Sequence, residues 1–283
     1  MILLTGATGT VGRLVAERLS GTGPLRLLTR YPHRVTLARP GIEVVRGDFD
    51  DPAGLRTALV GVRSCLLITA NPLAPAQDRN FVAAARAAGV SQVVKLSAQA
   101  VTEPDAIDLI TRWQRENERL LRASGLAWTF LRPRAFMSNT LGWARSIREE
   151  GVVRGLDGTA RNASVDPRDI ADVAVQALTA PEAHAGRAYA LTGPVAITPS
   201  EQTEILGDLL HRPLKFMELT ESQLLRGLLA RHPEPMALAL VESAARGRGG
   251  GKAQVEPDVQ ELLGRPGRGY REWATEHLTE FGG

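Results

Sequence analysis

Short apolar runs alternate with amphipathic stretches along the first half of the chain. The runs are apolar on both faces, which is typical of strands in a sheet that helices cover on both sides. They occupy residues 2–5, 25–29, 42–45, 65–69, 92–97 and 127–131. Helical spacing occupies residues 10–20, 52–60, 75–88 and 108–124 between them. This order predicts repeated βαβ units and therefore an α/β fold with a doubly wound parallel sheet.

The alternation ends after Pro133, and the second half reads differently. We expect helices over 136–150 and 166–179, and strands over 187–192 and 214–219, in an otherwise mostly helical remainder. The glycine-rich segment after residue 150 is expected to be a turn. The stretch RGRGGGK at 246–252 is expected to be a flexible, solvated loop whose charge needs no partner.

These patterns predict two domains. A dinucleotide-binding domain is expected over 1–132 plus 166–192. A smaller, mostly helical substrate-binding lobe is expected over 133–165 plus 193–283, above the carboxyl ends of the strands.

Composition narrows the class of protein. The 283 residues are 43% hydrophobic and 23% charged, which is ordinary for a globular protein. The formal net charge is +3, but the sequence has no basic segment with interspersed aromatic residues. Nucleic acid is therefore not an expected partner. The single Cys65 excludes disulfides within the chain and fits a reducing compartment. No apolar run approaches the roughly 18 residues of a membrane span, so we expect a cytoplasmic protein. We also expect no metal site.

Three glycines follow the first apolar run, in the sequence TGATGTVG. Gly6 permits a tight turn, Gly9 lets backbone approach a pyrophosphate, and Gly12 lets the following helix pack closely on the strand. The start of that helix offers N–H groups to phosphates, and Thr8 and Thr10 can add hydroxyl donors. The alternative is a glycine turn without a ligand.

Three segments carry a resemblance to a known family. TGATGTVG, SGLAWTFLRPRAFMSN (124–139) and VDPRDIADVA (165–174) resemble the NmrA-like branch of the atypical short-chain dehydrogenase/reductases. The resemblance covers residues 1–192 well and implies a Rossmann domain, with Val11 and Pro133 beside the cofactor. The branch includes quinone reductases, reductases of ergot-alkaloid-type imines, and regulators that bind the dinucleotide without turning it over.

The end of the second strand indicates the cofactor. NAD-preferring enzymes carry an acidic residue there, whereas this chain has Arg30 and, one turn later, Arg34. Two guanidinium groups suit a 2′-phosphate, so we expect NADP(H), unless both are solvated surface arginines. The resemblance places Asp48 and Phe49 at the adenine edge. It also places the backbone of Thr69, Ala70 and Asn71 along the cofactor.

The family's catalytic tyrosine and lysine positions align with Ile110 and Gln114, so that acid pair is absent. Ser97 ends the fifth strand, where the family has its active-site hydroxyl, and contacts the cofactor there if the resemblance holds. Ser97 and Gln114 are therefore the candidate catalytic residues, and a hydroxyl that merely bonds the backbone is the alternative for Ser97. Lys95 shares a strand face with Ser97 and is expected to snorkel or pair.

A substrate pocket is expected beside the nicotinamide. Its candidate residues are Trp113, Gln114, Phe136, Met137 and Asn139, although plain core packing is the alternative for Trp113 and for the apolar helix face.

Together these features predict an NADPH-dependent oxidoreductase that transfers hydride to a flat, activated small molecule. Quinones, enones and imines are electrophilic already, so their reduction does not need the missing tyrosine. The substrate is expected to be aromatic or an intermediate of secondary metabolism. Two alternatives stay open: an NADP(H)-sensing regulator without turnover, and an isomerase or dehydratase with a structural cofactor. A monomer and a homodimer are equally compatible with the sequence.

Overall fold

The computed structural model describes the backbone of residues 1–283 and the exposure of every residue except Gly249. The chain divides into two compact units. The first comprises residues 1–101, 112–132 and 167–189, and the second comprises residues 102–111, 133–166 and 190–283.

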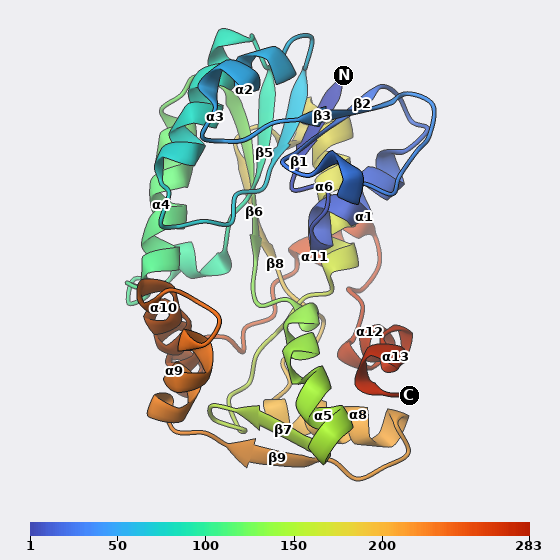
Figure 1. The fold of residues 1–283 in the computed structure, drawn as a ribbon, viewed down its shortest axis with the longest axis vertical. Helices are drawn as coiled ribbons and strands as arrows, with labels where there is room; N and C mark the ends of the chain where they lie inside the picture. Colours follow the sequence, from blue (N-terminus) through green and yellow to red (C-terminus); the bar gives the residue numbers. More distant parts are fainter. The chain divides into compact units, whose positions relative to one another are not determined.

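A seven-stranded sheet forms the centre of the first unit, in the order β3-β2-β1-β4-β5-β6-β8 (Figure 1). The strands are β1 (Ile2–Thr5), β2 (Leu25–Thr29), β3 (Ile42–Arg46), β4 (Ser64–Leu67), β5 (Gln92–Leu96), β6 (Ala127–Pro133) and β8 (Arg187–Leu191). Strands β1 to β6 pair in parallel. The strand order reverses beside β1, between β2 and β4, which is where a doubly wound sheet opens a crevice for a ligand.

Helices cover both faces of this sheet (Figure 1). One face carries α2 (Pro52–Ala58), α3 (Ala76–Ala87) and α4 (Leu109–Arg122), and the other carries α1 (Thr10–Leu19) packed against α6 (Pro167–Thr179). The short elements α7 (Pro181–His184), η1 (Pro32–Arg34) and η2 (Gln99–Thr102) complete the helical segments here. The central strands are therefore apolar on both faces because both faces are covered, and Leu3, Leu67 and Phe130 are completely buried. The edge strands β3 and β8 are more exposed.

The second unit is mostly helical and has a small sheet of its own. β7 (Val152–Gly155) pairs in parallel with β9 (Lys215–Glu218). The helical elements are η3 (Met137–Trp143), α5 (Ala144–Glu150), α8 (Pro199–Leu209), α9 (Glu221–Leu229), α10 (Glu234–Ala245), η4 (Arg246–Gly249), α11 (Asp258–Leu263), α12 (Tyr270–Glu276) and α13 (Leu278–Phe281). Met137, Ile147, Leu206, Trp273 and Phe281 form its core.

Three expectations about the second half need correction. The helix expected over 136–150 is a 3₁₀ segment followed by α5, since Thr140 and Gly142 have low helix propensity. The expected turn after residue 150 contains β7, because β9 supplies a pairing partner. The stretch 246–252 is not a free solvated loop: it begins with a 3₁₀ turn, and Arg246 forms an ion pair with Asp108.

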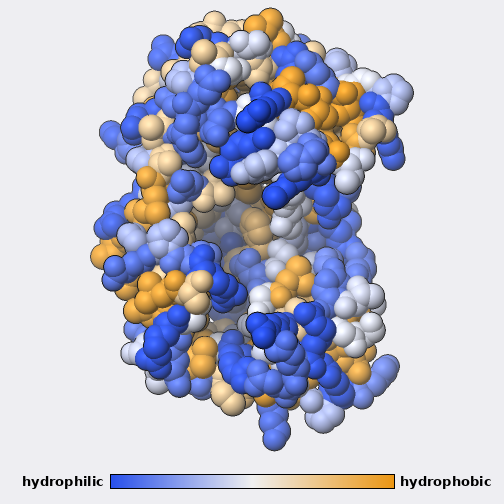
Figure 2. Space-filling view, viewed as in Figure 1, coloured by the Kyte–Doolittle hydropathy of each residue, from blue (hydrophilic) through white to orange (hydrophobic). Residues whose placement is uncertain are grey.

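Figure 2 shows charged and polar residues mixed with small apolar patches over the viewed surface. Of the helices in the described chain, none has the length and apolarity to cross a membrane.

Candidate functional site

The glycine loop between β1 and α1 is shaped by its own backbone. Gly6 has a φ of +65°, a left-handed conformation that favours glycine. A Cβ at Gly12 would lie 2.1 Å from the Gly6 carbonyl oxygen, so only glycine fits there. At Gly9 a Cβ would contact only that same oxygen, at 3.3 Å, and φ is an ordinary −92°. The chain's own conformation therefore requires Gly6 and Gly12, whereas Gly9 leaves space for a ligand.

A pocket of about 420 Å³ opens beside this loop, at the carboxyl ends of β1 to β4. Nine predicted cofactor residues line it: Gly6, Thr8, Gly9, Arg30, Arg34, Asp48, Phe49, Ala70 and Asn71. The lining residues that we did not predict are Leu28, Thr29, Tyr31, Gly47, Ile68 and Gln77. The position of Tyr31 beside Arg30 was the available signal for it, since a ring between two arginines can order both.

Arg30 and Arg34 both lie against Tyr31. Their guanidinium carbons are 5.6 Å and 4.7 Å from the ring centroid, within the range of cation–π contacts. All three side chains are exposed at the pocket. Asp48 is the one carboxylate among the residues that line this pocket, and its Oδ1 accepts a hydrogen bond from the backbone N–H of Asp50. The end of β2 therefore presents positive charge to any bound group.

Phe49 and Asp51 hold the β3–α2 connection in place. The Phe49 ring packs edge-on against Phe81, and its carbonyl accepts a hydrogen bond from Asn80. Asp51 caps α2 by accepting from the N–H groups of Ala53 and Gly54. Asp48 and Phe49 are thus fixed on a rigid turn at the pocket edge.

Six other predicted cofactor residues do not line this pocket: Thr10, Val11, Gly12, Thr69, Ser97 and Pro133. Thr10 begins α1, and Val11 and Gly12 are buried within it. Thr69 is also buried, with a hydroxyl that accepts from Lys95 and donates to Asp78, both at 2.8 Å. Their roles at a cofactor stay predictions.

Lys95 lies completely buried beneath the ends of β4 and β5. Its ammonium is 3.6 Å from the Asp78 carboxylate, and Asp78 also accepts from the indole N–H of Trp113. Burial lowers the pKa of Lys95, and the Asp78 charge opposes that shift. The pairing expected for Lys95 is confirmed. Trp113 is 7% exposed and belongs to this network, so the structure favours the packing alternative for it over stacking on a substrate.

The Ser97 hydroxyl donates a hydrogen bond to the Glu118 carboxylate, with 2.7 Å between Oγ and Oε1. Glu118 is also held by two hydrogen bonds from Arg132, at 2.6 and 2.9 Å, and it is almost fully buried. The Ser97 oxygen can still accept a hydrogen bond, but its proton is engaged by a carboxylate. This geometry makes Ser97 a poor general acid.

Gln114 is 6% exposed, and its Oε1 atom is buried without a hydrogen-bond partner. A buried amide oxygen without a partner is costly, and such groups are expected to meet a ligand, a water molecule or a moving side chain. Gln114 therefore stays the more suggestive of the two candidate catalytic residues.

Pro133, predicted beside the cofactor, and Phe136, Met137 and Asn139, predicted in the substrate pocket, have different environments within the second unit. Pro133 and Met137 are buried, and Met137 belongs to the core of this unit. Phe136 is half-buried, and its backbone bridges to Val165. Asn139 is exposed. Of these residues, Met137 fits the core-packing alternative best.

The three tyrosines of the chain lie in different environments. Tyr270 is buried and donates to Thr140, and burial raises the pKa of its hydroxyl. Tyr189 contacts the ring nitrogen of His184, and Tyr31 packs beneath the arginines. No group of three or more His, Cys, Asp or Glu residues suited to a metal ion occurs in the described part of the chain.

The fold and the loop define a class, and comparison with known proteins identifies it. Residues 6–181 match the family described as NAD(P)H-binding, and the chain belongs to this family. It is an NAD(P)H-dependent oxidoreductase of the NmrA-like, atypical short-chain dehydrogenase/reductase type.

Three relatives span essentially the whole chain. The (4-alkanoyl-5-oxo-2,5-dihydrofuran-3-yl)methyl phosphate reductase of Streptomyces griseus is 55% identical over 281 residues, covering 99% of each chain. The NAD(P)H azoreductase of Xenophilus azovorans is 36% identical over 288 residues, covering 100% of this chain and 99% of the relative. The NADPH-dependent quinone oxidoreductase of Escherichia coli, solved with NADPH, superposes with a TM-score of 0.87 at 31% identity, covering 99% and 100%.

Proposed function

We propose that this protein uses NADPH to reduce the ring double bond of a 4-alkanoyl-butenolide that carries a phosphomethyl group. The 55% identity to the Streptomyces griseus reductase over nearly the full length of both chains supports this substrate. The azoreductase and quinone oxidoreductase relatives support the broader class, since azo compounds and quinones are also flat, electron-poor hydride acceptors.

The proposal rests mainly on the hydrogen bonding of Ser97 and on the residue at position 110. The Ser97 hydroxyl donates a hydrogen bond to Glu118, and the family's tyrosine position holds Ile110. An unactivated ketone needs a proton on its oxygen as hydride arrives, so it fits these residues poorly. A substrate that stabilises its own negative charge fits them well.

The proposed substrate has that property. Its ring double bond is conjugated at one carbon with both the alkanoyl and the lactone carbonyl groups. NADPH supplies the hydride, which adds to the other ring carbon, the one bearing the phosphomethyl group. The electron pair of the double bond is then shared by two carbonyl oxygens, and water supplies the proton that completes the saturated lactone. The protein needs only to bind, orient and desolvate the reactants.

The pocket at the strand ends fits the cofactor. Gly9 leaves backbone exposed for the pyrophosphate, and the start of α1 offers N–H groups to it. Arg30 and Arg34 present donors for a 2′-phosphate, which is why we propose NADPH rather than NADH. Asp48 would accept from the adenine amine and Phe49 would pack on its ring, and the position of both residues in the pocket lining supports these roles.

Gln114 is our candidate for orienting the substrate. Its amide lies at the family's lysine position on α4 and has an unused buried oxygen. An amide beside the acceptor can hydrogen-bond a carbonyl or hydroxyl group without delivering a proton.

The test is NADPH oxidation with two substrates that share one alkanoyl chain. One is the butenolide phosphate, and the other is the corresponding saturated keto-lactone phosphate, whose ketone is the only group left to reduce. We expect turnover of the first and none of the second. Reduction of the keto group, or of neither compound, would contradict the proposal.

A further inference from the structure

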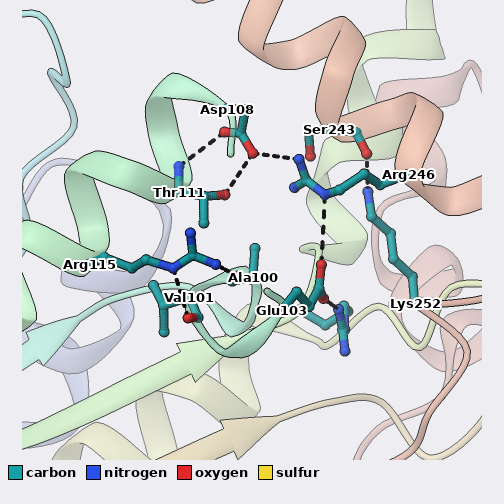
Figure 3. A network of polar contacts seen from close by, with 10 residues as sticks. Ala100, Val101, Glu103, Asp108, Thr111, Arg115, Ser243, Arg246 and Lys252 are labelled. Carbon is teal, nitrogen blue, oxygen red and sulfur yellow. Dashed lines mark hydrogen bonds and ion pairs between the residues drawn. The ribbon is translucent and has the colours of Figure 1, made fainter. Parts of the chain in front are cut away.

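A cluster of charged side chains within the second unit lies outside the pocket described above. It joins three segments that are distant in the sequence. Glu103 and Asp108 come from the segment before α4, Arg134 follows directly after β6, and Arg246 and Lys252 come from the segment after α10. Figure 3 shows Arg246 between the carboxylates of Asp108 and Glu103, with Lys252 beside it.

Ion pairs and hydrogen bonds connect the five side chains to one another and to the backbone. Arg246 pairs with Asp108 at 2.5 Å and lies 3.7 Å from Glu103, which also pairs with Arg134. Asp108 is almost fully buried and accepts two further hydrogen bonds from Thr111. Lys252 donates to the carbonyl oxygen of Ser243 at 2.5 Å. Its own carbonyl accepts from Ala163, which fixes the position of this residue.

The charges of the cluster do not cancel. Arg134 and Arg246 balance Glu103 and Asp108, so the charge of Lys252 is left over. Among the described residues, no carboxylate lies within ion-pair distance of the Lys252 ammonium, which meets a neutral carbonyl instead. An uncompensated charge in a partly buried setting is unfavourable unless an anion joins it.

The cluster also has donors to spare. The Arg134 side chain is 7% exposed, and its Nε–H is buried without an acceptor. The Nε–H of Arg246 also has no acceptor within hydrogen-bond distance, since the Glu103 carboxylate is 3.7 Å away. Two N–H groups of Lys252 remain beyond the one that bonds Ser243. A structural ion-pair network would be expected to use these donors, since buried polar groups are normally satisfied.

We propose, on the basis of the function proposed above, that Arg134, Arg246 and Lys252 bind the phosphate group of the phosphomethyl substrate. A phosphate monoester carries up to two negative charges near pH 7 and three acceptor oxygens. It would neutralise Lys252 and satisfy the open guanidinium donors at once. Arg134 directly follows Pro133, the last residue of β6, so its backbone is anchored at the end of this strand.

The experiment compares two substrates and three variants of the full-length protein. The substrates are the butenolide phosphate and its dephosphorylated alcohol, and the readout is the ratio of their kcat/KM values. The variants are Lys252→Met, Lys252→Arg and the control Lys215→Met, which removes an exposed lysine from β9. Circular dichroism and NADPH affinity establish that each variant is folded and binds the cofactor.

We expect the wild type and Lys215→Met to prefer the phosphate ester. Lys252→Met should lower that preference by about tenfold or more, the range for a hydrogen bond to a charged group, and Lys252→Arg should restore most of it. A wild type that reduces both compounds equally well would overturn the phosphate site while leaving the reductase intact. A Lys252→Met variant that loses activity on both compounds equally, or that loses NADPH affinity, would also overturn it. A wild type that reduces neither compound would instead overturn the proposed function.

Discussion

The Ser97 hydroxyl is the group whose chemistry depends most on its neighbours. From the sequence it was a candidate proton donor, but the structure directs its proton to Glu118, which Arg132 holds in place. A sequence pattern cannot supply this contact, because the three residues come from a strand end, a helix and another strand.

Ser97→Ala should therefore slow reduction by less than about tenfold. Loss of a true general acid costs roughly 10²–10⁴-fold, so steady-state kcat distinguishes the two roles. Ser91→Ala is a matched control, because Ser91 is exposed at the start of the same strand region. A loss within the larger range, together with an altered pH profile, would make Ser97 the donor.

Arg30 is the residue that should decide cofactor choice. Arg30→Ala should weaken NADPH binding by about tenfold or more and leave NADH binding nearly unchanged, because only the 2′-phosphate needs the guanidinium. Calorimetric titration of both cofactors measures this. Arg39→Ala is the control, since Arg39 is exposed nearby but does not line the pocket. Equal loss for both cofactors would contradict the assignment.

Lys252 should make phosphate recognition depend on pH. Burial, with Arg246 and Arg134 nearby, lowers the pKa of Lys252 to about 8, although Glu103 and Asp108 oppose the shift. The ammonium is therefore present below about pH 8 and lost above it, while the phosphate gains its second charge above about pH 6.

The kcat/KM for the phosphate ester should thus be highest between these two pH values and should fall as pH rises through 8. The alcohol should not show that fall. Since kcat/KM reports the free enzyme and free substrate, parallel profiles for the two compounds would contradict the role of Lys252.

At the scale of elements, the glycine loop joins sequence to function most directly. Gly9→Val should abolish NADPH binding with little loss of fold, because the chain leaves space at this position and the added side chain would occupy it. Thermal unfolding with and without NADPH tests this, and NADPH should raise the Tm of the wild type only.

Gly269→Val is the matched control for that experiment. Gly269 is also a helix N-cap with ordinary φ, and a Cβ there would meet nothing within 4 Å. This variant should keep the NADPH-induced rise in Tm. If Gly9→Val keeps it too, the loop is only a turn.

The sequence predicted some elements well and others poorly for identifiable reasons. The strands β1, β2, β4 and β5 were recognisable because helices bury both of their faces, which leaves continuous apolar runs. The edge strand β3 is more exposed. β7 was missed because it is short and its partner β9 lies far along the chain. The residues 246–252 looked solvated because Asp108, the partner of Arg246, lies 138 positions earlier in the chain.

At the scale of the whole molecule, features set by strand topology could be predicted from the sequence, and contacts between distant side chains could not. The clustering of nine predicted residues in one pocket was predictable, because these residues sit at the ends of neighbouring parallel strands that the topology brings together. Their contacts with a cofactor stay predictions. The Lys95–Asp78–Trp113 network and the charged cluster that contains Lys252 were not predictable. Each depends on contacts between side chains from separate elements. The substrate-binding role of the second unit, and a monomeric or dimeric state, stay predictions.

The central proposal is that hydride goes to a carbon of the ring and not to a carbonyl carbon, because Ser97 is hydrogen-bonded to Glu118 and Ile110 stands where the resemblance places a tyrosine. The most direct measurement uses NADPH deuterated at C4 of the nicotinamide, with the butenolide phosphate as substrate and NMR of the product. We predict deuterium on the ring carbon that bears the phosphomethyl group, in a saturated lactone with its alkanoyl group intact. Deuterium on the former alkanoyl carbonyl carbon, as a secondary alcohol, would contradict the account.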